Sequence, residues 1–128
     1  MASNSRPLHS SFTDQATDLE LLAALKSGDV SAFSLLYDRY VNLVYAIALR
    51  ILGQPEEAED ITQEVLLRLW HQPDHYQPDR GSLSNYLAMV TRSKAIDRVR
   101  SRSSKLRVLQ RVRTVLTPDV TASNLLES

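Results

Sequence analysis

The apolar residues of this chain recur at intervals of three and four over most of its length, which is the spacing of one helix face. The clearest case lies between residues 31 and 52, where this spacing predicts one long helix with a buried stripe: Phe33, Leu36, Tyr37, Tyr40, Val44, Ile47 and Ile51. Asp29 or Ser31 can cap the start of this helix, and Gly53 ends it. No regular alternation of apolar and polar residues is present, so an all-β fold is not expected.

Further helices are expected on both sides of this one. A short helix over residues 17–28 begins with a capping box, Thr-Asp-Leu-Glu, and stops at a glycine. The next helix runs over about residues 55–71 and buries a stripe formed by Ala58, Ile61, Val65 and Leu69. A fourth helix begins after Ser82, which can cap it, and reaches at least Arg100; residues 105–116 could also be helical. We therefore predict an all-α fold, a compact bundle of about four helices.

The predicted domain limits follow from composition. Residues 1–16 are polar and have no helical period, so they are expected to be a flexible N-terminal tail. Residues 17–102 form the expected helical domain, and residues 103–128 are expected to be a basic linker and C-terminal tail. Within the domain, two prolines forbid regular structure over residues 71–81.

Several protein classes are excluded by what the chain lacks. Its 128 residues contain no cysteine, so disulfides, thiolate catalysis and Cys-ligated zinc are impossible. The N-terminus has no apolar segment typical of a secretory signal. The longest apolar run, residues 43–49, is far shorter than the ~20 residues of a membrane span. We expect a soluble cytoplasmic protein with no membrane insertion.

The formal net charge of zero conceals two strongly polarised segments. Residues 54–79 contain seven acidic residues and one basic residue, whereas residues 92–113 contain nine basic residues and one acidic residue. Asymmetry of this kind favours two different partners. The alternative is that both segments are ordinary solvated helix faces, or that they attract each other.

The acidic segment carries a candidate protein-binding face. Asp60, Gln63, Glu64 and Leu67 are spaced by three and four, so they share one helix face opposite the buried stripe. An exposed leucine surrounded by acids and an amide is typical of a docking patch, although single exposed leucines are also ordinary.

The basic segment is preceded by side chains suited to single-stranded nucleic acid. His75 and Tyr76 lie in the proline-rich loop, and the fourth helix carries Asn85, Tyr86, Arg92 and Lys94. Aromatic rings stack on bases, amides read base edges, and Arg or Lys side chains contact phosphates. For the two tyrosines, the alternative is that their rings simply seal the bundle.

An enzyme is not expected. His71 and His75 would align as metal ligands on a helix, but Pro73 breaks the helix between them. The chain has no Gly-rich phosphate loop and no nucleophile motif, so we expect no catalytic residue, no metal and no cofactor.

Four blocks in order resemble region 2 of bacterial sigma factors, and most closely the extracytoplasmic-function (ECF) group. They are DVSAFSLLY (29–37), EAEDITQEVLLRLW (57–70), RGSLSNYL (80–87) and AIDRVR (95–100), and the resemblance covers roughly residues 18–102. It implies a transcription initiation factor domain that binds core RNA polymerase and recognises and melts the promoter −10 element. Polymerase binding, on the clamp helices of the β′ subunit, would fall to Asp60, Gln63, Glu64 and Leu67.

The resemblance also implies which residues contact promoter DNA. The loop over residues 71–81 would capture a base flipped from the −10 element, at a cost of a few kcal/mol that stacking recovers. The fourth helix would hold the single-stranded non-template strand. The implied DNA-binding residues are His75, Tyr76, Arg80, Ser84, Asn85, Tyr86, Arg92, Lys94, Arg98 and Arg100.

Three departures from the family pattern refine this expectation. Met89 and Val90 stand where primary sigma factors present a tryptophan pair, and ECF members also lack this pair. Ser93 stands where ECF members often have asparagine. A full ECF factor also has a second helical domain, region 4, which is not expected after Pro118, so either the chain is a piece of a longer protein or region 2 acts alone. An anti-sigma factor is a possible further partner. The alternative function is therefore a sigma-like interaction module that binds polymerase or an anti-sigma factor without supporting initiation.

Overall fold

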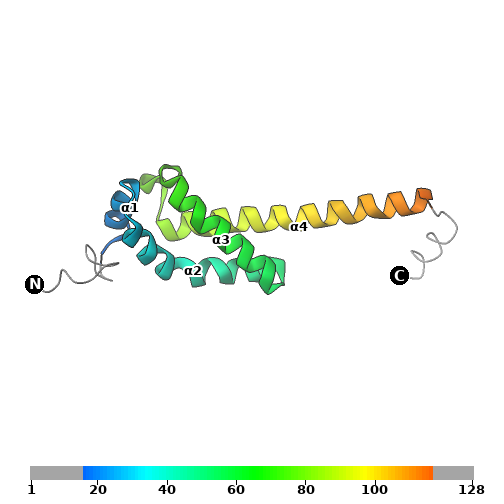
Figure 1. Cartoon of the computed structure of the whole chain (residues 1–128), viewed down its shortest axis with the longest axis horizontal. Helices are drawn as coiled ribbons and strands as arrows, with labels where there is room; N and C mark the ends of the chain where they lie inside the picture. Colours follow the sequence, from blue (N-terminus) through cyan, green and yellow to red (C-terminus); the bar gives the residue numbers. More distant parts are fainter. Residues whose placement is uncertain (1–15, 117–128) are drawn as a thin grey trace, which may run out of the picture. The chain divides into compact units, whose positions relative to one another are not determined.

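The computed structural model describes residues 16–116, which form four α-helices and two short 3-10 turns with no strand among them (Figure 1). The elements are α1 (Asp18–Lys26), α2 (Val30–Leu52), α3 (Pro55–His71), η2 (Pro73–His75), η3 (Pro78–Arg80) and α4 (Leu83–Leu116). The predicted all-α bundle is confirmed. The predicted tails at residues 1–15 and 117–128 lie outside the described residues.

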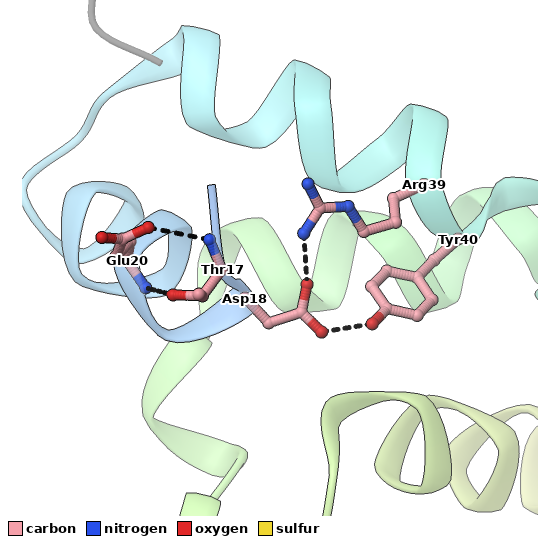
Figure 2. Close-up of polar contacts among 5 residues, drawn as sticks. All are labelled: Thr17, Asp18, Glu20, Arg39 and Tyr40. Carbon is pink, nitrogen blue, oxygen red and sulfur yellow. Dashed lines mark hydrogen bonds and ion pairs between the residues drawn. The ribbon is translucent and has the colours of Figure 1, made fainter. Parts of the chain in front are cut away.

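Two caps set the starts of the first two helices. The Thr17 hydroxyl accepts from the Glu20 amide at 3.1 Å, and the Glu20 carboxylate accepts from the Thr17 amide at 2.8 Å (Figure 2), which is the predicted capping box. For α2, Asp29 rather than Ser31 is the cap: its carboxylate accepts from the Ser31 hydroxyl at 2.6 Å and the Ser31 amide at 2.9 Å. These hydrogen bonds, the hydroxyl first, lower the pKa of Asp29.

The core is formed by α1, α2, α3 and the first turns of α4, and α2 packs against both α1 and α3. The predicted stripe of α3 is right, because Ala58, Ile61, Val65 and Leu69 are all buried. The predicted stripe of α2 is right only in part. Leu36 and Val44 are buried and its other five residues are half-buried, whereas the centre of the buried face is formed by Ala32, Leu35, Leu36, Val44, Ala48 and Leu52.

The error in α2 has a physical reason. This helix is apolar around most of its circumference, so the three–four spacing fits several faces and does not identify the most buried one. Its large aromatic residues lie at the border of the core instead. Phe33 packs its ring 5.2 Å from that of Trp70 in α3 and 6.1 Å from that of Tyr37, and all three rings are partly exposed.

The fourth helix reaches past Arg100, as predicted, and residues 105–116 are helical. It continues without a break through Ser103 and Ser104 to Leu116. Contacts divide the chain into two compact units between Ala95 and Ile96, so α4 contributes its first part to one unit and its remainder to the other. Among residues 16–116, no helix is long and apolar enough to cross a membrane.

Candidate functional site

The outer face of α3, formed by Asp60, Gln63, Glu64 and Leu67, is exposed along its length. Leu67 keeps 48% of its surface accessible, although the neighbouring positions Val65, Leu66 and Leu69 are buried. The structure therefore brings the four predicted polymerase-binding residues together on one accessible helix face. An apolar side chain with carboxylates and an amide beside it has the composition of a small docking surface.

A pocket of about 400 Å³ lies where the η2–η3 loop meets the first turns of α4. This volume is within the range of small-ligand sites, about 300–1,000 Å³. We call it the loop pocket; its lining residues are His75, Tyr76, Gln77, Arg80, Gly81, Ser82, Asn85, Tyr86 and Met89. Five of the predicted DNA-binding residues line it: His75, Tyr76, Arg80, Asn85 and Tyr86.

Tyr76 anchors the wall of the loop pocket. Its side chain is buried, its hydroxyl donates to the Gly81 carbonyl at 2.8 Å, and its ring lies 5.3 Å from that of Tyr86. Burial, and then the charge of Asp18, raise the pKa of Tyr76, so its hydroxyl keeps its proton and remains a donor. Tyr76 thus has the packing role that the sequence left open as an alternative, and it lines the pocket at the same time.

The polar part of the loop pocket contains a guanidinium, an imidazole and two side-chain amides, from Arg80, His75, Gln77 and Asn85. Arg68 of α3 places Nη2 at 3.2 Å from Nδ1 of His75. Because a guanidinium can only donate, this contact is a hydrogen bond in the tautomer in which Nδ1 carries no proton. The Arg80 guanidinium can only donate, whereas the side-chain amides of Gln77 and Asn85 can donate or accept, so the lining can pair with acceptors on a ligand edge.

The N-terminal turn of α4, which carries part of the pocket lining, is capped by Ser82 as predicted. The Ser82 hydroxyl accepts from the Asn85 amide at 3.1 Å. This bond fixes the first turn of the helix, which carries both Asn85 and Tyr86 into the pocket lining.

The other predicted DNA-binding residues lie elsewhere. Ser84 is half-buried and is not part of the pocket lining, whereas Arg92 is exposed on α4. Lys94 is half-buried and pairs with Glu64 at 3.8 Å. The sequence predicted that Lys94 binds DNA and that Glu64 binds polymerase. An ion pair that is partly exposed and has an N–O distance of 3.8 Å contributes little stability. Arg98 and Arg100 belong to the second unit.

Sequence reasoning missed Gln77, Gly81, Ser82 and Met89 as lining residues of the loop pocket. A signal was available for Met89, which follows Asn85 by four and Tyr86 by three and therefore shares their helix face. For Gly81 the signal is weaker: its φ of 140° favours glycine, and this conformation turns the chain from η3 into α4.

Comparison with known proteins gives consistent matches. Residues 36–105 match the sequence model of a family described as "Sigma-70 region 2". The "ECF RNA polymerase sigma factor SigK" of Mycobacterium sp. (strain KMS) is 40% identical over 86 residues, which are 66% of this chain and 45% of that protein. The protein of the same name from Mycobacterium tuberculosis (strain ATCC 25177 / H37Ra) is 31% identical over 86 residues, 66% of this chain and 46% of that protein.

A third relative of that name, from Mycolicibacterium vanbaalenii (strain PYR-1), is 36% identical over 81 residues, 63% of this chain and 41% of that protein. The chain thus spans slightly less than half the length of the curated relatives it matches. No solved structure gives a significant match.

Proposed function

Because this chain belongs to the sigma-70 region 2 family, in its ECF group, we propose that it is the part of a transcription initiation factor that binds core RNA polymerase and recognises and melts the promoter −10 element. The protein acts on the exposed non-template strand and holds it single-stranded. This function requires no catalytic residue, and it implies action in the cytoplasm, where polymerase and promoter DNA meet.

The loop pocket is the observation that carries the proposal. A base extruded from a duplex needs a cavity with aromatic walls and donors or acceptors at its edge. The loop pocket offers the rings of Tyr76, Tyr86 and His75 as walls, and donors from Arg80 and Asn85 beside them. Acceptor atoms on a base edge fit this set of donors.

The strand continues from the pocket along α4. Met89, 58% exposed, lies one turn beyond Tyr86 at the pocket border, where an apolar side chain can separate neighbouring bases. Arg92 follows on the exposed surface, with Lys94 close behind, and both neutralise phosphates. Arg98 and Arg100 supply further backbone contacts.

Core polymerase docks on the outer face of α3, with the β′ clamp helices as its partner. Leu67 supplies the apolar contact at the centre, and Asp60, Gln63 and Glu64 pair with basic and polar groups around it. The accessibility of all four residues supports this assignment.

A titration with single-stranded DNA tests the promoter-binding role. A pool of oligonucleotides with a randomised ten-base core is selected on the immobilised protein, and the winning sequence is compared with its single-base variants by fluorescence anisotropy. We expect a several-fold loss of affinity at one or two positions. Binding that depends on salt but not on sequence contradicts −10 recognition and favours the interaction module.

A pull-down with core polymerase tests the docking face. Leu67→Asp, or Asp60→Arg, is expected to abolish binding while leaving the helical circular dichroism signal intact. Leu19→Asp is the matched control, because Leu19 of α1 is exposed to a similar degree, 56%. Unchanged affinity of the Leu67→Asp protein would remove α3 from the interface.

A further inference from the structure

Helix α1 does not line the loop pocket, yet it contacts the segment that forms it. The helix packs against η2, the turn that leads into Tyr76. At its C-terminal end, Lys26 pairs with Asp74 of η2 at 3.2 Å. At its N-terminal end, the charge of Asp18 adds to the burial that raises the pKa of Tyr76. Helix α1 therefore contacts the turn that leads into Tyr76.

Asp18 is itself fixed by two side chains of α2 (Figure 2). One carboxylate oxygen accepts from Arg39 Nη1 at 2.8 Å, and the other accepts from the Tyr40 hydroxyl. Asp18 and Arg39 are each only 27% exposed at their side chains. Burial, and then the hydrogen bond to Asp18, raise the pKa of Tyr40, so its hydroxyl remains a donor at physiological pH. The cluster is a shielded, charge-assisted anchor between α1 and α2.

The loop depends on such anchoring because it has almost no core of its own. Between His71 and Ser82, Tyr76 is the only buried residue, and the two 3-10 turns contain three residues each. Tyr76 directly follows η2, which packs against α1, and its hydroxyl holds the Gly81 carbonyl. A shift of α1 would therefore act through η2 on Tyr76 and on the Gly81 backbone in the pocket lining.

We propose that Asp18 and Tyr40 are positioning residues for the loop pocket: they hold α1 against α2 beside Tyr76, and so set how sharply the pocket distinguishes one base from another. Neither residue touches the DNA. This inference rests on the proposed function, because it assumes that the loop pocket takes a promoter base. Part of the base selectivity would then depend on α1, a helix that contacts η2 but does not line the pocket.

Tyr40→Phe is the main test, because it removes one hydroxyl and keeps the ring. The readout is the discrimination ratio, the Kd for the worst single-base variant divided by the Kd for the selected oligonucleotide. We expect this ratio to fall by about fivefold, the equivalent of one hydrogen bond, at the position read by the pocket and at no other. Core-polymerase affinity is expected to stay unchanged. Asp18→Asn is a second variant, which weakens both contacts of the cluster.

Thr17→Ala is the matched control. It destabilises the same helix by removing the capping box that Figure 2 shows beside Asp18, but it leaves the Asp18 contacts in place. If Tyr40→Phe and Thr17→Ala lower the melting temperature similarly and only Tyr40→Phe lowers the discrimination ratio, the positioning role is supported. If both lower the ratio alike, the cluster acts through stability alone and the inference is wrong. A wild-type protein without base preference overturns the proposed function itself, whereas a preference that Tyr40→Phe retains overturns only the positioning role.

Discussion

The two parts of α4 have similar sequence periodicity and opposite surroundings. From Leu83 to Ala95, five residues are buried: Leu83, Leu87, Val90, Thr91 and Ala95. From Ile96 to Val115 no side chain is buried, and Leu106, Val108, Leu109, Val112 and Val115 are exposed by 46–77%. The same three–four spacing thus belongs to core-forming residues in the first part and to an exposed apolar stripe in the second.

This difference shows what helical spacing predicts and what it leaves undecided. Spacing of apolar residues identifies a face, but burial requires another element to cover that face. In the first unit, α1, α2 and α3 provide the other core residues. The second part of α4 is strongly basic: residues 98–113 contain seven basic residues and no acidic one. A helix of that composition is suited to an acidic partner.

The largest expected difference concerns the stability of the fold. Leu87→Ala removes a side chain that is 1% exposed, and we expect the free energy of unfolding to fall by about 2–5 kcal/mol. Leu109→Ala removes the same atoms from a side chain that is 57% exposed, and a change within about 0.5 kcal/mol is expected. Urea denaturation followed by circular dichroism measures both. A comparable loss for Leu109→Ala would mean that the exposed stripe is covered in solution.

Much of the fold followed from local signals whose physics is short-ranged. The Thr17 capping box, the Ser82 cap and the left-handed Gly53 each depend on a few neighbouring residues, and all three stand as predicted. The limits of α2 and α3 followed for the same reason. The buried face of α2 did not, because it depends on where α1 and α3 pack, which no local pattern contains.

The candidate site was predictable as a set of residues but not as a geometry. The outer face of α3 needed only helical spacing, and five residues of the loop pocket came from their chemistry and the resemblance. The ion pair of Lys94 with Glu64, the contact of Arg68 with His75 and the anchoring by Asp18 join residues from different elements. Such contacts depend on tertiary packing, so the sequence alone did not indicate them. The roles of these residues in binding stay predictions.

A pair of threonines sharpens the comparison within α4. Thr91 donates to the Leu87 carbonyl at 2.6 Å in the core, and Thr114 donates to the Gln110 carbonyl at 2.8 Å at the surface. Thr91→Ala is expected to cost about 1 kcal/mol, because it removes a buried methyl group and a hydrogen bond. Thr114→Ala is expected to be neutral or to stabilise by up to about 0.5 kcal/mol through its higher helix propensity. Equal losses in thermal melts would contradict the contrast.

DNA binding provides a third contrast between the two parts. Arg92→Ala, with or without Lys94→Ala, is expected to weaken binding of the selected single strand and to reduce the slope of log K against log[salt] by about 0.7 for each phosphate that is no longer neutralised. Arg111→Ala, in the exposed second part, is expected to leave the slope unchanged. Anisotropy titrations at four salt concentrations measure this. If only Arg111→Ala lowers the slope, the strand follows the second part and the assignment of Arg92 and Lys94 is wrong.

The smallest expected effect concerns the ion pair of Lys94 with Glu64. Lys94→Met keeps most of the aliphatic stem and removes the charge, and we expect a loss of no more than about 1 kcal/mol, because both groups are partly exposed. Most of that loss should vanish in 1 M salt, where the Debye length is about 3 Å. Lys105→Met, on the exposed second part of α4, is the matched control and is expected to have no measurable effect at either salt concentration. A loss for Lys94→Met that persists in 1 M salt would mean that the ion pair is shielded from dissolved ions, which contradicts the partial exposure of both groups.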